Sequence, residues 1–73
     1  MKYGAILFHT TSSAMQAQKV LTSKGYRVIM IPTPRQLSSD CGIAVRFNWQ
    51  EQAEVKEMLD KGGVEVQAIH EIA

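Results

Sequence analysis

Apolar residues along this chain occur in short runs or alternate positions in some stretches and at helical spacing in others. The first pattern predicts β-strands and the second predicts α-helices. Residues 3–8 form a short, nearly continuous apolar run, which is typical of a strand inside a sheet. Residues 27–31 are rich in Val and Ile and precede a proline, whereas residues 43–47 place the large apolar residues Ile43, Val45 and Phe47 at alternate positions. We therefore expect strands in these three stretches, with Pro32 ending the second, and a fourth strand over residues 64–72.

Two further stretches repeat apolar residues at helical spacing. The first covers about residues 12–24 and follows a group of potential N-capping side chains in residues 9–13. The second begins after Asn48, with Glu51 at the third helical position in a capping-box arrangement, and ends at the glycine pair 62–63. The chain is therefore predicted to contain two helices, each lying between two strands.

The order βαββαβ with short connections matches the ferredoxin-like arrangement, an α+β fold in which two helices cover one face of a four-stranded antiparallel sheet. The 73 residues are expected to form a single domain, residues 1–73, with one small core. A right-handed crossover makes the first two strands parallel, so the first helix begins at the sheet edge that also carries the loop after the second strand. We therefore expect Cys41 and Gly42, at the end of that loop, to approach residues 9–12.

Charge and composition narrow the possible partners. The formal net charge is +1, and the basic residues are scattered among acidic ones, which argues against nucleic acid or a membrane surface as a partner. The aromatic residues lack the glycine-aromatic motif of RNA-binding sheets. The apolar run at residues 3–8 is too short for a signal peptide or a membrane span. We therefore expect a small, soluble cytoplasmic protein.

The chain has one cysteine, Cys41, which lies in the turn-rich segment 32–42. Cysteines usually behave as small buried hydrophobes, so a position among Ser, Asp and Gly indicates a reactive thiol. A single cysteine excludes an intramolecular disulfide, a Cys-x-x-Cys redox pair and a four-cysteine zinc site. Because His9, Asp40, Cys41 and His70 show no spacing typical of metal ligands, the sequence predicts neither a metal nor a cofactor.

Three segments carry a resemblance to a known family: the strand–helix junction with Phe8, Thr11 and Ala14, the segment Ile31-Pro32-Thr33-Pro34-Arg35, and the segment Ser38-Ser39-Asp40-Cys41-Gly42. Together they resemble the small bacterial domains described as selenium/sulfur carrier-like proteins, and the resemblance covers nearly the whole chain. Its most specific part is Pro-x-Pro-Arg followed by Ser-x-x-Cys-Gly. The resemblance implies that Cys41 holds sulfur or selenium as a persulfide-type adduct.

Six residues near Cys41 are candidates for binding this adduct: His9, Thr11, Ser12, Arg35, Asp40 and Gly42. Arg35 either holds an anionic adduct or a partner's carboxylate, or is simply solvated. Asp40 is more typical of a turn former than of a general base, and Gly42 is expected to let the chain enter the third strand at an unusual backbone angle. The family pattern has a histidine after the junction threonine, where this chain has Ser12; His9 is either a substitute base or a solvated side chain.

Two functional hypotheses follow. The leading one is a thiol carrier, rather than a stand-alone enzyme, that takes a chalcogen from a donor protein and passes it to an acceptor protein. The alternative is a non-catalytic interaction or ligand-sensing module in which Cys41 is an incidental thiol packed under its loop. Apolar residues at both alternating positions of the first two strands favour a homodimer through the open sheet face. The carrier hypothesis expects a Cys41 thiol that is displayed, ionised and reachable at the positive end of a helix. A thiol sealed in hydrocarbon and far from the first helix would leave only the module.

Overall fold

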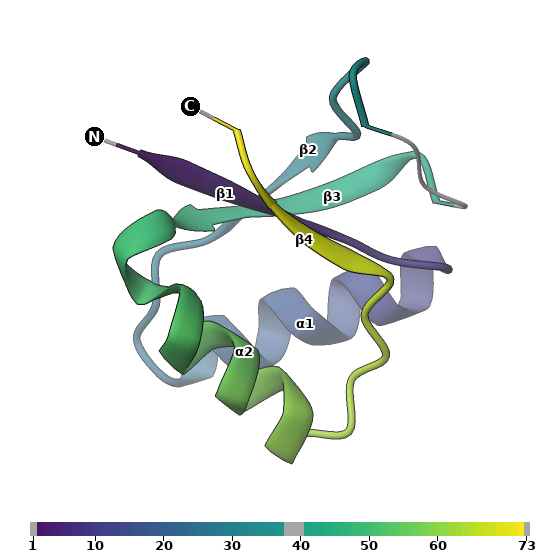
Figure 1. Ribbon diagram of the computed structural model, residues 1–73. Helices are drawn as coiled ribbons and strands as arrows, with labels where there is room; N and C mark the ends of the chain where they lie inside the picture. The colour runs from purple at the N-terminus through teal and green to yellow at the C-terminus, as the bar shows by residue number, and fades with distance from the viewer. Residues whose placement is uncertain (1, 38–40, 73) are drawn as a thin grey trace.

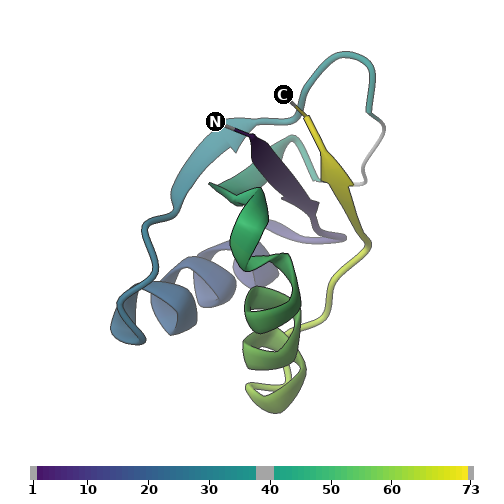
Figure 2. The ribbon, with the colours of Figure 1, turned by 60° about the vertical axis from the view of Figure 1, so that its left-hand side comes forward.

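The computed structural model describes residues 2–37 and 41–72, and it confirms the predicted fold (Figure 1). The described elements are β1 (Tyr3–Leu7), α1 (Thr11–Ser23), β2 (Ile29–Pro32), β3 (Ile43–Asn48), a 3₁₀ turn (Trp49–Glu51), α2 (Gln52–Lys61) and β4 (Ala68–Glu71). Within the described residues, four strands form one antiparallel sheet in the order β2-β3-β1-β4. Both α1 and α2 lie on the same face of this sheet, as Figures 1 and 2 show from two directions.

The predicted limits of two strands are wrong. The second strand begins at Ile29 instead of residue 27, and Pro32 is its last residue, paired with Ile43. The fourth strand begins at Ala68, because the segment before it closes the end of α2: the Val64 N–H donates to the Leu59 carbonyl at 3.0 Å. An apolar residue such as Val64 thus belongs to the core without belonging to the sheet.

The helix ends show which capping side chains are used. Thr10 is the N-cap of α1, and its Oγ1 accepts a hydrogen bond from the Ser13 N–H at 3.2 Å. Asn48 caps the 3₁₀ turn that precedes α2, accepting from the Gln50 N–H at 3.0 Å. The predicted cap at Asn48 therefore exists, but the chain makes one tight turn before the α-helix begins. Gly25, with a φ of 88°, reverses the chain after α1.

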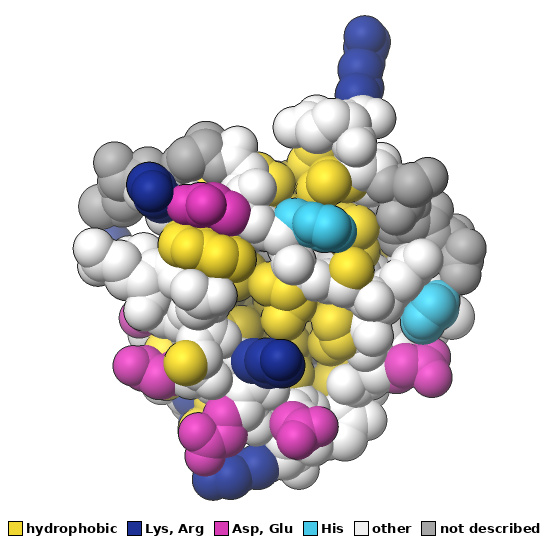
Figure 3. Space-filling model, in the orientation of Figure 1, with side chains coloured by type: hydrophobic (Ala, Val, Ile, Leu, Met, Phe, Trp, Pro, Cys, Tyr) yellow, Lys and Arg dark blue, Asp and Glu magenta, His cyan; other side chains and the backbone are white. Residues whose placement is uncertain are grey.

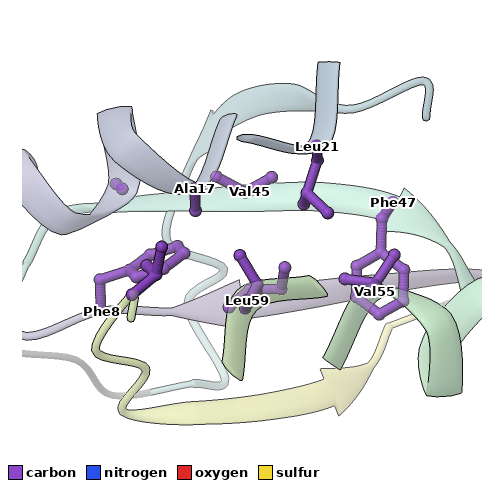
Figure 4. Close-up of a cluster of buried hydrophobic side chains, with 10 residues drawn as sticks. Phe8, Ala17, Leu21, Val45, Phe47, Val55 and Leu59 are labelled. Atoms are coloured by element: carbon purple, nitrogen blue, oxygen red, sulfur yellow. The ribbon is translucent and has the colours of Figure 1, made fainter. Parts of the chain in front are cut away.

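The core lies between the sheet and the helices. Its buried residues are Ile6, Phe8, Ala14, Ala17, Leu21, Val45, Phe47, Val55, Leu59 and Val64. Figure 4 shows Val55 and Leu59 of α2 facing Ala17 and Leu21 of α1, with Phe8 and Phe47 toward the ends of the cluster. Each fully buried aliphatic or aromatic side chain stabilises the fold by about 1.5–3 kcal/mol relative to exposure. This single layer of side chains holds α1 and α2 on the sheet.

A glycine in β1 is needed for this packing. A Cβ built on Gly4 would lie 2.5 Å from the Phe47 ring and 2.6 Å from the Trp49 ring. The two rings therefore rest directly on the β1 backbone, with their centroids 6.0 Å apart. Any side chain at Gly4 would push them away from the sheet.

The opposite sheet face carries a smaller apolar cluster that no helix covers. It consists of buried Ala5, Leu7 and Ala44, with Ile31, Leu37, Ala68 and Ile72 packed around them. Near one end of this face the Arg46 guanidinium lies 4.4 Å above the centre of the Tyr3 ring. Ile29 at the same end is 46% exposed. The open face is therefore mainly apolar, with a cation held on one aromatic ring.

Candidate functional site

Cys41 lies immediately before β3, at the end of the sheet where β1 finishes and α1 begins. Its Sγ is 3.5 Å from Oγ1 of Thr11, the first residue of α1, although the two residues are 30 positions apart in the sequence. The antiparallel register pairs Leu7 at the end of β1 with Ala44 near the start of β3, which brings these two segments together. The expected approach of Cys41 to the start of the first helix is confirmed.

The thiol is nevertheless buried, because only 4% of Cys41 is exposed. The structure thus combines one feature of each hypothesis. The burial contradicts the displayed, reachable thiol that the carrier hypothesis expects and agrees with the incidental-thiol hypothesis. The position beside the opening turn of α1 is what the carrier hypothesis expects. The sulfur is not sealed in hydrocarbon alone, since the Thr11 hydroxyl is within hydrogen-bonding distance of it.

The opening turn of α1 is an electrostatically positive environment. The 13-residue helix has no acidic residue in its first turn that would offset the positive end of its dipole. The Thr11–Cys41 contact can have either atom as the donor while the sulfur carries a proton. If the sulfur is anionic, only the Thr11 hydroxyl can donate. Helix and hydroxyl would therefore both stabilise a negative charge on Cys41 or on a group bound to it.

Thr33 donates hydrogen bonds to the carbonyl groups of both Cys41 and Gly42. Its Oγ1 donates to the Cys41 carbonyl at 3.0 Å, and its backbone N–H donates to the Gly42 carbonyl at 3.0 Å. The second bond continues the β2–β3 ladder one pair beyond Pro32. The sequence analysis did not single out Thr33; its position between Pro32 and Pro34 in a stiff segment was the available signal.

Two candidates after β2, Arg35 and Gly42, have exposed positions. Arg35 is exposed on a turn closed by the Leu37 N–H and the Pro34 carbonyl, 2.9 Å apart. Gly42 is exposed and does not have a positive φ, so the predicted unusual backbone angle is wrong. Strand pairing through Thr33, rather than a glycine conformation, leads the chain into β3.

The remaining candidates surround the strand–helix junction. His9 and Ser12 are both exposed, one just before the capping Thr10 and the other in the first turn of α1. Asp40 lies outside the described residues. The structure therefore brings Thr11 into contact with Cys41 and leaves His9 and Ser12 at the surface beside it.

Two searches of the described residues, for a metal site and for a membrane-spanning helix, bear on the site. In the part of the chain that the structure describes, no group of three or more His, Cys, Asp or Glu residues is arranged to hold a metal ion. His70, one of the possible metal ligands in the sequence, lies in β4 and pairs with Ala5 of β1. Among the helices of the same residues, none has both the length and the apolar character that crossing a membrane requires.

Comparison with known proteins identifies the family. Searches of curated proteins and of solved structures gave no match. A family model described as "Putative Se/S carrier protein-like" matches residues 3–71. This span runs from the first residue of β1 to the last residue of β4 and includes both Thr11 and Cys41. The chain therefore belongs to the Se/S carrier protein-like family.

Proposed function

We propose that this protein is a carrier of sulfur or selenium and that Cys41 is the residue that holds the atom. In the loading step the Cys41 thiolate attacks the outer sulfur of a donor protein's persulfide. A bond forms between the two sulfurs, the S–S bond of the donor breaks, and the donor cysteine leaves as a thiolate. No net oxidation or reduction occurs. A selenopersulfide donor transfers selenium by the same exchange.

The observation that carries this proposal is the 3.5 Å contact between Cys41 Sγ and Thr11 Oγ1 at the start of α1. A persulfide anion on Cys41 would extend the negative charge beside the same helix end, where the Thr11 hydroxyl and the helix dipole stabilise it. Unloading reverses the chemistry: a nucleophile of the acceptor protein attacks the outer atom, and the Cys41 thiolate leaves. A thiol that must stay reduced between cycles fits the reducing cytoplasm.

Burial of Cys41 has a consequence for transfer. With only 4% of the residue exposed, a partner's sulfur can reach it only when the Cys41–Gly42 segment opens locally. The two Thr33 hydrogen bonds oppose this opening. In the closed form the same burial protects an adduct from water and small thiols. A donor or acceptor protein that stabilises the open segment would therefore gain access that small molecules lack.

Intact mass spectrometry tests the assignment. The protein is incubated with a cysteine desulfurase and either cysteine or selenocysteine, and is then weighed without reductant. We expect the parent to gain one sulfur or selenium atom that a reductant removes, and a Cys41→Ser variant to gain none. Added chalcogen on the serine variant would refute the role of Cys41.

A matched pair of variants tests the role of Thr11. Thr11→Val keeps the side-chain shape but removes the hydroxyl, whereas Thr11→Ser retains it. We expect the adduct to decay faster in the valine variant and at the parent rate in the serine variant. Equal lifetimes in all three proteins would show that the hydroxyl has no part in holding the adduct.

The alternative function, an interaction module that dimerises through the open sheet face, is favoured by one separate observation. Ile29 is 46% exposed at the margin of the apolar cluster on that face. If this face joins two copies, Ile29→Glu will lower the dimer fraction measured by sedimentation equilibrium. Met15→Glu is the control, because Met15 is 59% exposed on α1 and lies away from the open face. An unchanged monomer–dimer distribution in Ile29→Glu would exclude this interface.

A further inference from the structure

The outer edge of β4 has backbone groups that can pair with another strand. The Ile72 N–H donates to the Tyr3 carbonyl at 2.8 Å, which makes these residues a hydrogen-bonded pair of the β1–β4 ladder. Such pairs alternate along antiparallel strands, so the N–H and C=O groups of Ile69 and Glu71 point away from β1. None of these groups has a backbone partner among the described residues. Edge strands of this kind can add a further strand.

A groove runs beside this edge, between β4 and α2. Its volume is about 540 Å³, and its lining residues are Trp49, Gln52, Lys56, Leu59, Asp60, Val64, Val66, Ala68 and Ile69. Figure 3 views the groove from outside and shows hydrophobic side chains along its floor, with charged groups at its margins. The groove lies on the helix side of the sheet, because Ile69 pairs with Ile6 of the core.

The edge and the groove are complementary to one kind of ligand. In an added strand, the residue opposite Ile69 would direct its side chain to the helix side, and therefore into the groove, as would every second residue. Lys56 lies on the α2 wall and makes no ion pair with a described residue. Its ammonium group is therefore available to an acidic side chain that enters the groove.

We propose that β4 and the adjacent groove bind an extended segment of a partner protein by strand addition. The segment has apolar side chains at alternate positions and one acidic side chain on the same face, opposite Lys56. This is a docking surface for peptide backbone and side chains together. The proposal stands independently of the carrier function, because Cys41, Thr11 and Thr33 do not line the groove.

An NMR titration with a defined probe tests this proposal. The probe is the capped peptide acetyl-Thr-Val-Thr-Val-Thr-Glu-Thr-amide, which presents two valines and the glutamate on one face. We expect saturable shifts of the Ile69 and Glu71 amide signals in the millimolar range, together with slower hydrogen exchange of both amides. Failure of these two amides to respond, or larger shifts at the Met30 amide of β2, would overturn the proposal.

Two N-methylated peptides separate strand addition from general apolar contact. Methylation of the amides of the valines and the glutamate removes the N–H groups that would donate to the Ile69 and Glu71 carbonyls. Methylation of an equal number of threonine amides leaves those donors intact. We expect only the first peptide to lose binding. Equal binding by both would overturn strand addition.

Two more measurements test the role of the Lys56 charge and whether a second copy of the protein occupies the β4 edge. Lys56→Glu should weaken the probe by about threefold or more, whereas Lys56→Arg should bind as the parent does. Equal binding by the glutamate variant would overturn the acidic specificity. Amides of Ile69 and Glu71 that become protected in the peptide-free protein as its concentration rises would show that a second copy occupies the edge, and would overturn the proposed partner.

Discussion

The two edges of the sheet are built differently, although both are short strands of four residues. At the β2 edge the ladder continues through Thr33 to Gly42, which places Met30 and Pro32 in the outward positions. Because proline has no N–H, Pro32 cannot donate to an added strand. At the β4 edge Ile69 and Glu71 occupy the equivalent positions with both backbone groups intact.

The difference separates two tasks of the proposed carrier, positioning of the thiol and docking of a partner. At the β2 edge Pro32 removes one outward N–H, while the Thr33 hydrogen bonds on the inner side of the strand hold the backbone at Cys41. The β4 edge leaves its backbone groups available beside an apolar groove. A partner that docks at β4 would therefore not compete with the hydrogen bonds that position the thiol.

The largest expected effect comes from removing the hydrogen bond between the Thr33 hydroxyl, just after β2, and the Cys41 carbonyl. Thr33→Val removes the hydroxyl that donates to the half-buried Cys41 carbonyl, so we expect a loss of about 1–2 kcal/mol in the free energy of unfolding. If this energy opposes local opening, Cys41 will react about tenfold faster with iodoacetamide, since 1.4 kcal/mol corresponds to a factor of ten. Urea unfolding and alkylation kinetics measure the two effects.

Thr33→Ser is the control for this prediction, because serine retains a hydroxyl at the same position. It should restore the slow alkylation of the parent. If the valine variant is destabilised but its Cys41 is alkylated at the parent rate, the Thr33 hydroxyl bond does not control access to Cys41.

A smaller effect is expected from opening the β2 edge itself. Pro32→Ala adds an outward N–H and increases the entropy of the unfolded chain, which costs about 0.4–1 kcal/mol of stability. The two edges then become alike, and we expect concentration-dependent association in sedimentation velocity beyond that of the parent. Pro34→Ala should not associate, because Pro34 lies in the turn after the strand. Identical behaviour of both variants and the parent would refute the role assigned to Pro32.

The smallest effect concerns a side-chain hydrogen bond between α2 and the segment that connects α1 to β2. Tyr26, just after α1, donates from its hydroxyl to Glu54 Oε2 at 3.1 Å. Desolvation of the phenol, followed by the hydrogen bond and the charge of Glu54, raises the pKa of Tyr26 above its ordinary value of 10.0. The raised pKa favours the protonated phenol in the folded state. The stabilisation is therefore complete below about pH 10 and is lost as the pH rises through the folded-state pKa.

Urea unfolding from about pH 8 to pH 11 checks this dependence. Tyr26→Phe lacks the titrating hydroxyl, so the stability difference between parent and variant should shrink as the pH rises. A difference that stays constant over this range would contradict the linkage. Groove binding at β4 in the same variant would show whether the Tyr26–Glu54 bond also influences the position of α2.

Much of the fold could be predicted because local patterns and packing agree. The apolar run of β1, the capped start of α1 and the alternation in β3 each indicate the element that forms. The errors occur where tertiary contacts outweigh local preference. Val64 and its neighbours have strand-like composition, yet Val64 closes the end of α2 and packs in the core. The glycine at position 42 suggested a special backbone angle, whereas strand pairing with Thr33 accounts for the geometry.

The sequence by itself determined the order of elements, the resemblance to a carrier family and the choice of Cys41, because these depend on periodicity and on a motif read along the chain. Only the tertiary structure decided that Thr11 contacts the thiol, that Thr33 holds its backbone and that Cys41 is buried. It also decided that Met30 and Pro32 take the outward positions of β2 and that Ile69 and Glu71 take those of β4. These properties depend on strand register and on the direction of backbone hydrogen bonds, which are set only when distant segments pair.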